Sequence, residues 1–172
     1  MGCDIHMHVE IRENNEWHYF QGEHFSLSDW EKEYTGQSKG NVPFDWRHYK
    51  MFAFLAGVRG TLTPIKEATY SLPEDVSDAV KNEWDDDNGH SISYLTAREL
   101  FEFDYSKDID NLTNKRRILF EKVKEKKDEY GSEDEIYYDV LGGPNSMFFT
   151  HVKELSELGD LDDVRIVFWF DN

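Results

Sequence analysis

Apolar and polar residues alternate in the amino-terminal segment Met1-Gly-Cys-Asp-Ile-His-Met-His-Val-Glu10. Alternation with a period of two is typical of a strand that buries one of its faces. The pattern predicts that the apolar positions face a core, and these are Cys3, Ile5, Met7, Val9 and Ile11. The opposite face then carries Asp4, His6, His8, Glu10 and Arg12.

The polar face of this strand predicts a functional site, because it sets carboxylate and imidazole side chains in one row. Residues two apart on a strand point the same way, and both groups suit borderline divalent cations. Asp4, His6 and His8 are therefore candidate ligands for zinc or manganese. Two other interpretations stay open. Asp4 and His6 form a proton-transfer pair without a metal, or a helix covers the strand and each imidazole is hydrogen-bonded beneath it.

The far end of the chain predicts a partner for the first strand. Val164 to Phe170 is an apolar and aromatic run of strand length, followed by Asp171 and Asn172. If the two terminal strands are neighbours, Asp171 approaches the polar row, at an end that depends on their relative direction. Few strands, several helices and no regular alternation between them predict an α+β fold. We expect one domain over residues 1–172, with a small, mostly antiparallel sheet packed against helices and long aromatic-rich loops.

Several shorter patterns predict the elements between the two ends. Residues 13–16 read as a hairpin turn, and residues 21–46 as an irregular, aromatic-rich loop. Gly57 is placed to end a helix over 49–56, and Thr96 with Glu99 forms a capping box before a helix that begins near Ala97. Further helices are expected over 77–84, 113–130 and 146–158, and a further strand over 136–141.

Three further positions are candidates for the same site. His90, in the polar segment Gly89-His-Ser91, is a candidate acid–base partner, and Ser91 a candidate ligand-binding residue. Arg59, between Gly57 and Gly60, suits a phosphate or carboxylate, because guanidinium and free backbone amides both bind anions. For His90 the alternative is a solvated side chain, and for Arg59 it is a surface arginine in a turn. Cys3 alternates with the core positions and reads as a small hydrophobe.

The charge of the chain limits its partners. The formal net charge of −17 opposes direct binding to nucleic acid, because phosphate backbones repel it. The acidity is either a solubilising surface or a surface that replaces phosphates on a basic partner protein. A lone cysteine, no signal peptide and no apolar run of membrane-spanning length predict a cytoplasmic protein without a membrane segment.

Two resemblances follow from these motifs. The spacing Asp4-x-His6-x-His8 resembles the opening of metal-dependent hydrolases of the amidohydrolase and PHP phosphoesterase types. Those enzymes need a large barrel, for which 172 residues are too few, so only the local ligand geometry is retained. The opening Met1-Gly-Cys-Asp-Ile-His6 and the closing Val164-Arg-Ile-Val-Phe-Trp-Phe-Asp-Asn172 resemble a poorly characterised family of small bacteriophage and bacterial proteins. Residues 49–59, 72–77 and 89–100 resemble its internal blocks, in the same order.

The family resemblance implies a phage or prophage setting and a single domain, and it brings no established activity. Together with the residues, it predicts a pocket of histidine and aspartate that binds a small anionic, nucleotide-like ligand. Asp4, His6 and His90 are the expected acid–base residues of a metal-dependent phosphoester hydrolase, and Arg59, Ser91 and Asp171 the expected ligand contacts. The alternative is a non-catalytic counter-defence protein that sequesters a nucleotide signal or blocks a basic host protein. The oligomeric state stays open.

Overall fold

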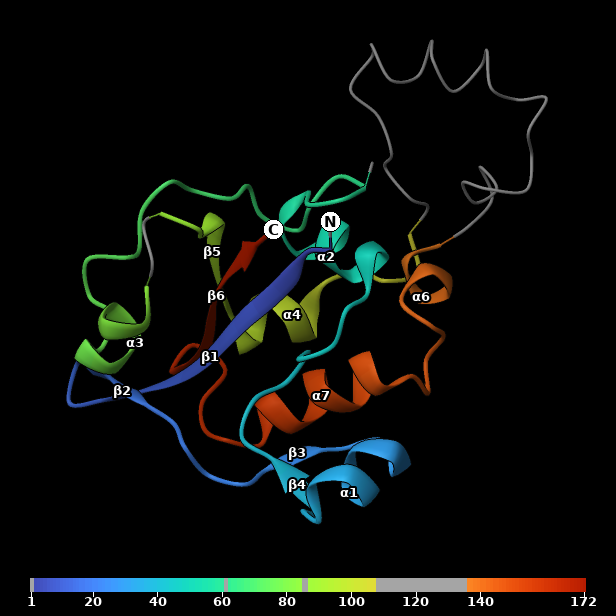
Figure 1. Ribbon diagram of the computed structural model, residues 1–172, viewed down its shortest axis with the longest axis horizontal. Coiled ribbons are helices and arrows are strands. Elements are labelled where there is room, and N and C mark those ends of the chain that lie inside the picture. Colours follow the sequence, from blue (N-terminus) through green and yellow to red (C-terminus); the bar gives the residue numbers. More distant parts are fainter. Residues whose placement is uncertain (1, 61, 85–86, 108–135) are drawn as a thin grey trace, which may run out of the picture.

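An antiparallel sheet of four strands, in the order β2-β1-β6-β5, forms the centre of the molecule (Figure 1). The computed structural model describes residues 2–60, 62–84, 87–107 and 136–172. In chain order the elements are β1 (Asp4–Glu13), β2 (Glu16–Tyr19), β3 (Phe25–Ser26), α1 (Asp29–Thr35), β4 (Lys39–Gly40), α2 (Tyr49–Ala56), α3 (Asp78–Glu83), β5 (His90–Thr96), α4 (Ala97–Glu102), α6 (Tyr137–Val140), α7 (Met147–Ser156) and β6 (Val164–Asp171). The predicted α+β fold is confirmed, and the helix expected over 113–130 lies outside the described residues.

The terminal strands are direct neighbours, as the sequence predicts. β1 and β6 run antiparallel in a register that opposes Asp4 to Asp171 and Ile11 to Val164. The amino end of β1 therefore lies beside the carboxyl end of β6, and the two chain termini lie close together (Figure 1). On the other side β1 turns into β2 through Asn14 and Asn15, whose φ values of 52° and 64° fit a two-residue hairpin turn.

One face of the sheet packs on the main core. Cys3, Ile5, Met7 and Val9 are buried there as predicted, together with apolar residues of β6, α2, α4 and α7. Helix α2 is buried over Met51–Ala56, and Gly57 ends it in the left-handed conformation. The predicted capping box before α4 is also present.

The opposite face of the sheet is covered only in part. On this face, Val80 of helix α3 and Val76 just before it form a small apolar cluster with residues of the sheet. The sheet residues are Ile92 of β5 and Val167 and Trp169 of β6. This cover buries the middle of the polar row of β1, where His8 and Glu10 are 3% and 0% exposed, whereas Arg12 beyond them is exposed. The near half, at the start of β1, stays at the surface.

Two local predictions were wrong. Helix α6 (Tyr137–Val140) lies where a strand is expected over 136–141, because Asp139 caps the Ile136 backbone and Gly142 continues the chain at positive φ. Residues 21–46 contain β3, α1 and β4. Helix α1 buries none of its residues, so it has no apolar periodicity for the sequence to reveal. Strand β5 begins at His90, and an irregularity between His90 and Ser93 interrupts its alternation.

Every helix in the described ranges falls short of the length and apolar character that a bilayer span requires.

Candidate functional site

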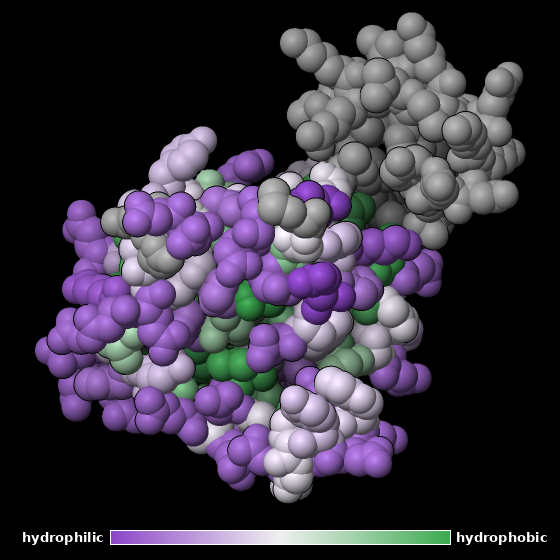
Figure 2. All heavy atoms as spheres, viewed as in Figure 1, coloured by the Kyte–Doolittle hydropathy of each residue, from purple (hydrophilic) through white to green (hydrophobic). Residues whose placement is uncertain are grey.

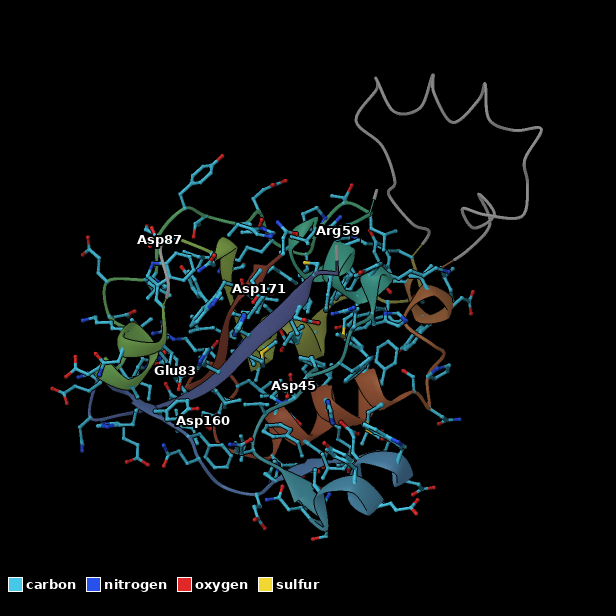
Figure 3. All side chains as sticks on the ribbon, in the orientation of Figure 1. Asp45, Arg59, Glu83, Asp87, Asp160 and Asp171 are labelled. Carbon is cyan, nitrogen blue, oxygen red and sulfur yellow. The ribbon has the colours of Figure 1, made fainter. Side chains whose placement is uncertain are left out.

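Charged side chains from separate parts of the chain meet where β1 begins and β6 ends. We call this group the sheet-end cluster, and it consists of Asp4, His6, Arg47, Arg59, His90 and Asp171. The antiparallel register of β1 and β6 creates it, because it opposes the first residue of β1 to the last residue of β6. Figure 3 shows Arg59 and Asp171 near the amino end of β1.

His6 and Asp171 form the most direct contact in the cluster. Nε2 of His6 lies 2.8 Å from Oδ2 of Asp171, and the side chains are 45% and 37% exposed. The hydrogen bond from His6 lowers the pKa of the Asp171 carboxyl. The imidazole also lies parallel to the Trp169 ring, with centroids 5.8 Å apart and an interplanar angle of 13°. An accessible imidazole is thus oriented by a carboxylate and an aromatic ring, which suits proton transfer.

Asp4 is held by Arg47. The guanidinium donates to one carboxylate oxygen from Nε at 3.0 Å and from the terminal nitrogen at 2.7 Å, and this bond raises the pKa of Arg47. Gly2 leaves the room for Arg47, because a Cβ there would lie 2.5 Å from a guanidinium nitrogen. Asp4 and His6 therefore lie on one face without being hydrogen-bonded to each other in the described structure.

Arg59 reaches the cluster from the loop after α2. Its guanidinium donates to the side-chain oxygen of Asn172 at 2.7 Å. Within the described ranges it forms no ion pair with a carboxylate. Its backbone adopts a φ of 57°, which is uncommon for a residue with a side chain. The next residue, Gly60, lies so close to α2 that a Cβ would come within 2.4 Å of the Ala53 Cβ. The loop is therefore pressed against the helix.

His90 and Ser91 complete the predicted set from β5. His90 opposes Phe170 in the sheet, and the two rings stack with centroids 6.2 Å apart. Nδ1 of His90 lies 3.0 Å from Oγ of Ser91, whose φ of 54° is also in the left-handed region. Nε2 of His90 is buried without a hydrogen-bond partner among the described residues. The charge of His90 contributes to the lowered pKa of Asp171, so His90 is within electrostatic reach of that carboxylate.

His8 does not belong to the cluster. Its ring nitrogens lie 3.3 Å from the carbonyl of Val167 and 3.0 Å from the carboxylate of Glu83, and it stacks on Trp169. The three predicted metal ligands therefore diverge, because Asp4 binds Arg47 and His6 binds Asp171. In residues 2–60, 62–84, 87–107 and 136–172, no group of three or more His, Cys, Asp or Glu side chains is arranged to hold a metal ion.

Cys3 lies beneath the cluster as the small buried residue that the sequence predicts. Its exposed fraction is 0%, and burial raises the pKa of the thiol, which disfavours the nucleophilic thiolate.

Two features near β1 were missed by the sequence interpretation. Asp45 lies within electrostatic reach of His6 and Asp4, and its surroundings raise the pKa of its carboxyl, mainly through desolvation. Glu10 forms a buried ion pair with Arg165 at 2.8 Å, and Asp75 binds the same guanidinium at 3.0 Å. The alternation of β1 places Glu10 on the polar face, but nothing in the sequence indicates that α3 covers it.

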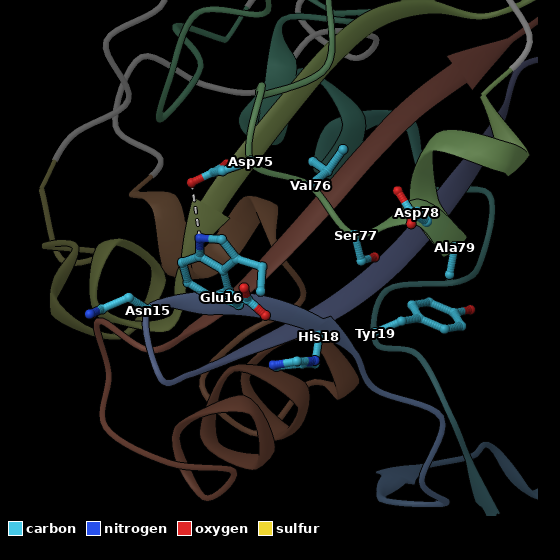
Figure 4. A pocket seen from close by; sticks show the side chains of 10 residues that line it. Asn15, Glu16, His18, Tyr19, Asp75, Val76, Ser77, Asp78 and Ala79 are labelled. Carbon is cyan, nitrogen blue, oxygen red and sulfur yellow. Dashed lines mark hydrogen bonds between the residues drawn. The ribbon is translucent and has the colours of Figure 1, made fainter.

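Two hollows lie on the described part of the surface, away from the sheet-end cluster. A groove of about 550 Å³ runs between β2 and the start of α3, where the Trp17 indole donates to Asp75 at 3.1 Å (Figure 4). A smaller hollow of about 210 Å³ lies between the start of α2 and that of α7. Neither of these two hollows is lined by members of the sheet-end cluster, whose residues Asp4, His6 and Asp171 are partly exposed at the surface.

Comparison with models of known protein families, with curated proteins and with solved structures finds no match to this chain.

Proposed function

We propose that the sheet-end cluster binds a small anionic ligand of nucleotide-like chemistry and that His6 transfers a proton in the hydrolysis of a phosphoester bond. The observation that carries the proposal is the hydrogen bond of 2.8 Å between His6 and Asp171 at an accessible position. A carboxylate that fixes an accessible imidazole is a recurrent arrangement for acid–base chemistry near neutral pH.

Arg59 supplies the contact with the anion. In a chain with net charge −17, the Arg59 guanidinium is a favourable place for a negative ligand, because its described partners are the side chain of Asn172 and the thiol of Cys3 and it forms no ion pair with a carboxylate in the described residues. Its left-handed backbone, like that of Ser91, costs about 1–3 kcal/mol, and such strain is concentrated at functional sites. Two strained residues at one end of the sheet support a binding role for that end.

The hydrolytic step needs one water and one base. His6 takes a proton from water as the water oxygen forms a bond to phosphorus. The bond from phosphorus to the leaving oxygen breaks, and the imidazolium returns the proton to that oxygen. Asp171 holds His6 and stabilises the imidazolium without itself taking the proton. In this step His6 transfers the proton, and Asp171 positions His6 and stabilises its charged form.

A divalent metal is not used in this proposal. Zinc or manganese would need Asp4, His6 and His8 to converge, and their partners Arg47, Asp171 and Glu83 hold them apart. Metal analysis of the purified protein tests this point, because the proposal expects no stoichiometric metal.

Calorimetric titration with AMP, GMP and their cyclic and dinucleotide forms tests binding. We expect at least one of these compounds to bind, and Arg59→Ala to weaken its binding about tenfold or more. His18→Ala, at an exposed position of β2, serves as the control and should bind as the unmodified protein does. Absence of binding to the whole panel, or equal binding by the Arg59 variant, overturns the proposal.

Analysis of the ligand after incubation separates hydrolysis from sequestration. Hydrolysis predicts loss of the bound nucleotide with a rate that falls in His6→Ala. Full recovery of the nucleotide after denaturation contradicts hydrolysis and favours a protein that sequesters a nucleotide signal. We place either role in the cytoplasm of a host cell during phage infection, on the lone cysteine and the resemblance of the two chain ends to phage proteins.

A further inference from the structure

We infer that helix α1 is a docking surface for a basic partner protein, with Trp30 and Tyr34 as its aromatic contacts. These residues are 68% and 78% exposed, and α1 buries none of its residues. Their rings stack with centroids 5.2 Å apart and an interplanar angle of 7°, so they form one flat aromatic surface. No residue of α1 belongs to the sheet-end cluster, and the inference does not depend on the nucleotide proposal.

Helix α1 is fixed at both ends although none of its residues is buried. Ser28 and Glu31 form a capping box at its start, and Gly36 ends it in the left-handed conformation. The two short strands on either side, β3 and β4, pair with each other and bracket the helix. A helix fixed in this way presents its aromatic rings with little loss of conformational freedom on binding, which favours affinity.

Strands β3 and β4, which flank α1, are attached to α7 by polar contacts. Glu154, which is 7% exposed, accepts hydrogen bonds at 3.0 Å from the backbone and hydroxyl of Ser26 and from Nζ of Lys39. Burial works against the charged carboxylate, but these bonds outweigh it and lower the pKa of Glu154. His151 adds a hydrogen bond of 2.8 Å to the carbonyl of Ser26. The aromatic pair thus stands on a firmly attached platform.

The charged residues around Trp30 and Tyr34 indicate which kind of partner protein would bind there. Asp29, Glu31 and Glu33 share the helix with a single lysine, Lys32, and the whole chain carries a net charge of −17. In the space-filling view, near-neutral side chains protrude at the α1 end of the molecule, flanked by hydrophilic ones (Figure 2). An aromatic centre with an acidic rim complements a basic protein surface with an apolar recess, since tryptophan and tyrosine are the commonest energetic centres of interfaces. An anionic membrane or a second copy of this chain would be repelled.

Titration with two synthetic peptides of equal charge tests the inference, one an amphipathic helix of lysine and leucine and the other polylysine. The double variant Trp30→Ala/Tyr34→Ala should bind the amphipathic peptide about tenfold more weakly, with little change for polylysine. Tyr70→Ala removes a fully exposed aromatic ring outside α1 and should leave both affinities unchanged. Circular dichroism should be the same for all three proteins, because the substituted side chains lie at the surface.

Three results overturn the inference. One is equal binding of the amphipathic peptide by the unmodified protein and the double variant, which would mean that charge alone attracts the peptide. Another is binding to neutral phosphatidylcholine vesicles that the double variant loses, which would assign the pair to a lipid surface. The third is a concentration-dependent dimer that the double variant loses in light scattering, which would assign the pair to self-association.

Discussion

His6 donates a hydrogen bond of 2.8 Å to Asp171 across the two terminal strands, joining residues 165 positions apart in the sequence. The bond lowers the pKa of the Asp171 carboxyl. We therefore expect His6→Ala to raise that pKa towards its ordinary value, as measured by carboxyl carbon NMR during a pH titration. His18→Ala should leave it unchanged. An Asp171 titration that is the same in the His6 variant would show that the contact does not form in solution.

A second prediction concerns His151, which is buried with an exposed fraction of 4% and accepts a hydrogen bond of 2.9 Å from the Phe44 backbone. Burial lowers the pKa of its imidazole below the ordinary value of 6.5. Below that value the unfolded chain binds a proton that the folded chain resists, so the free energy of unfolding falls as the pH drops through it. Urea unfolding at about pH 7 and about pH 5 should show this loss.

His151→Gln removes the titrating group and therefore shows how much of the pH dependence of the free energy of unfolding comes from His151. It should cost about 1–3 kcal/mol at pH 7, because buried hydrogen bonds to Phe44 or Ser26 are lost. The further loss between about pH 7 and about pH 5 should be smaller than in the unmodified protein. An identical pH dependence in both proteins would assign the acid sensitivity to other groups.

The buried pair of Glu10 and Arg165 gives a third prediction. Arg165→Met leaves the carboxylate buried without its partner and should lower the free energy of unfolding by about 3–5 kcal/mol. Glu10→Leu/Arg165→Met removes both charges and should be more stable than the single variant in urea unfolding. If the double variant loses as much free energy of unfolding as Glu10→Leu and Arg165→Met lose together, the two side chains do not interact.

The close approach of Gly60 to α2 gives a fourth prediction. Gly60→Ala places a methyl group against the Ala53 Cβ, within 2.4 Å, and should destabilise the protein by about 1–3 kcal/mol. Ala53→Gly in the same chain makes room for that methyl group. The double variant should therefore lose less stability than the sum of the two single variants, as measured by thermal unfolding. Strict additivity would show that the loop does not press on the helix.

The sequence predicted the parts of the fold that carry a strong local signal. The period of two in residues 3–11 fixed which side chains of β1 face the core. The glycine after α2 and the capping box before α4 marked helix ends that the structure confirms. Helix α1 and strand β5 lack such a signal, because α1 has no buried face and β5 is interrupted near Ser93.

The membership of the candidate site was only partly predictable. Pairing of the terminal strands was expected, and their antiparallel direction is what brings Asp171 to His6. The hydrogen bonds of Asp4 and His8 are made with Arg47 and Glu83. These partners lie in a loop and a helix whose positions follow from tertiary packing. For this reason the three residues predicted as one metal-ligand set, Asp4, His6 and His8, form separate contacts.

The most direct test of the central claim is a map of amide chemical shifts in the labelled protein during titration with the panel of nucleotides. If the sheet-end cluster binds the nucleotide, the shifts should saturate at residues 4–6, 59, 90–91 and 171, and they should disappear in Arg59→Ala. Saturating shifts confined to the groove beside Trp17 and Asp75, or no saturating shift with any nucleotide of the panel, would contradict it.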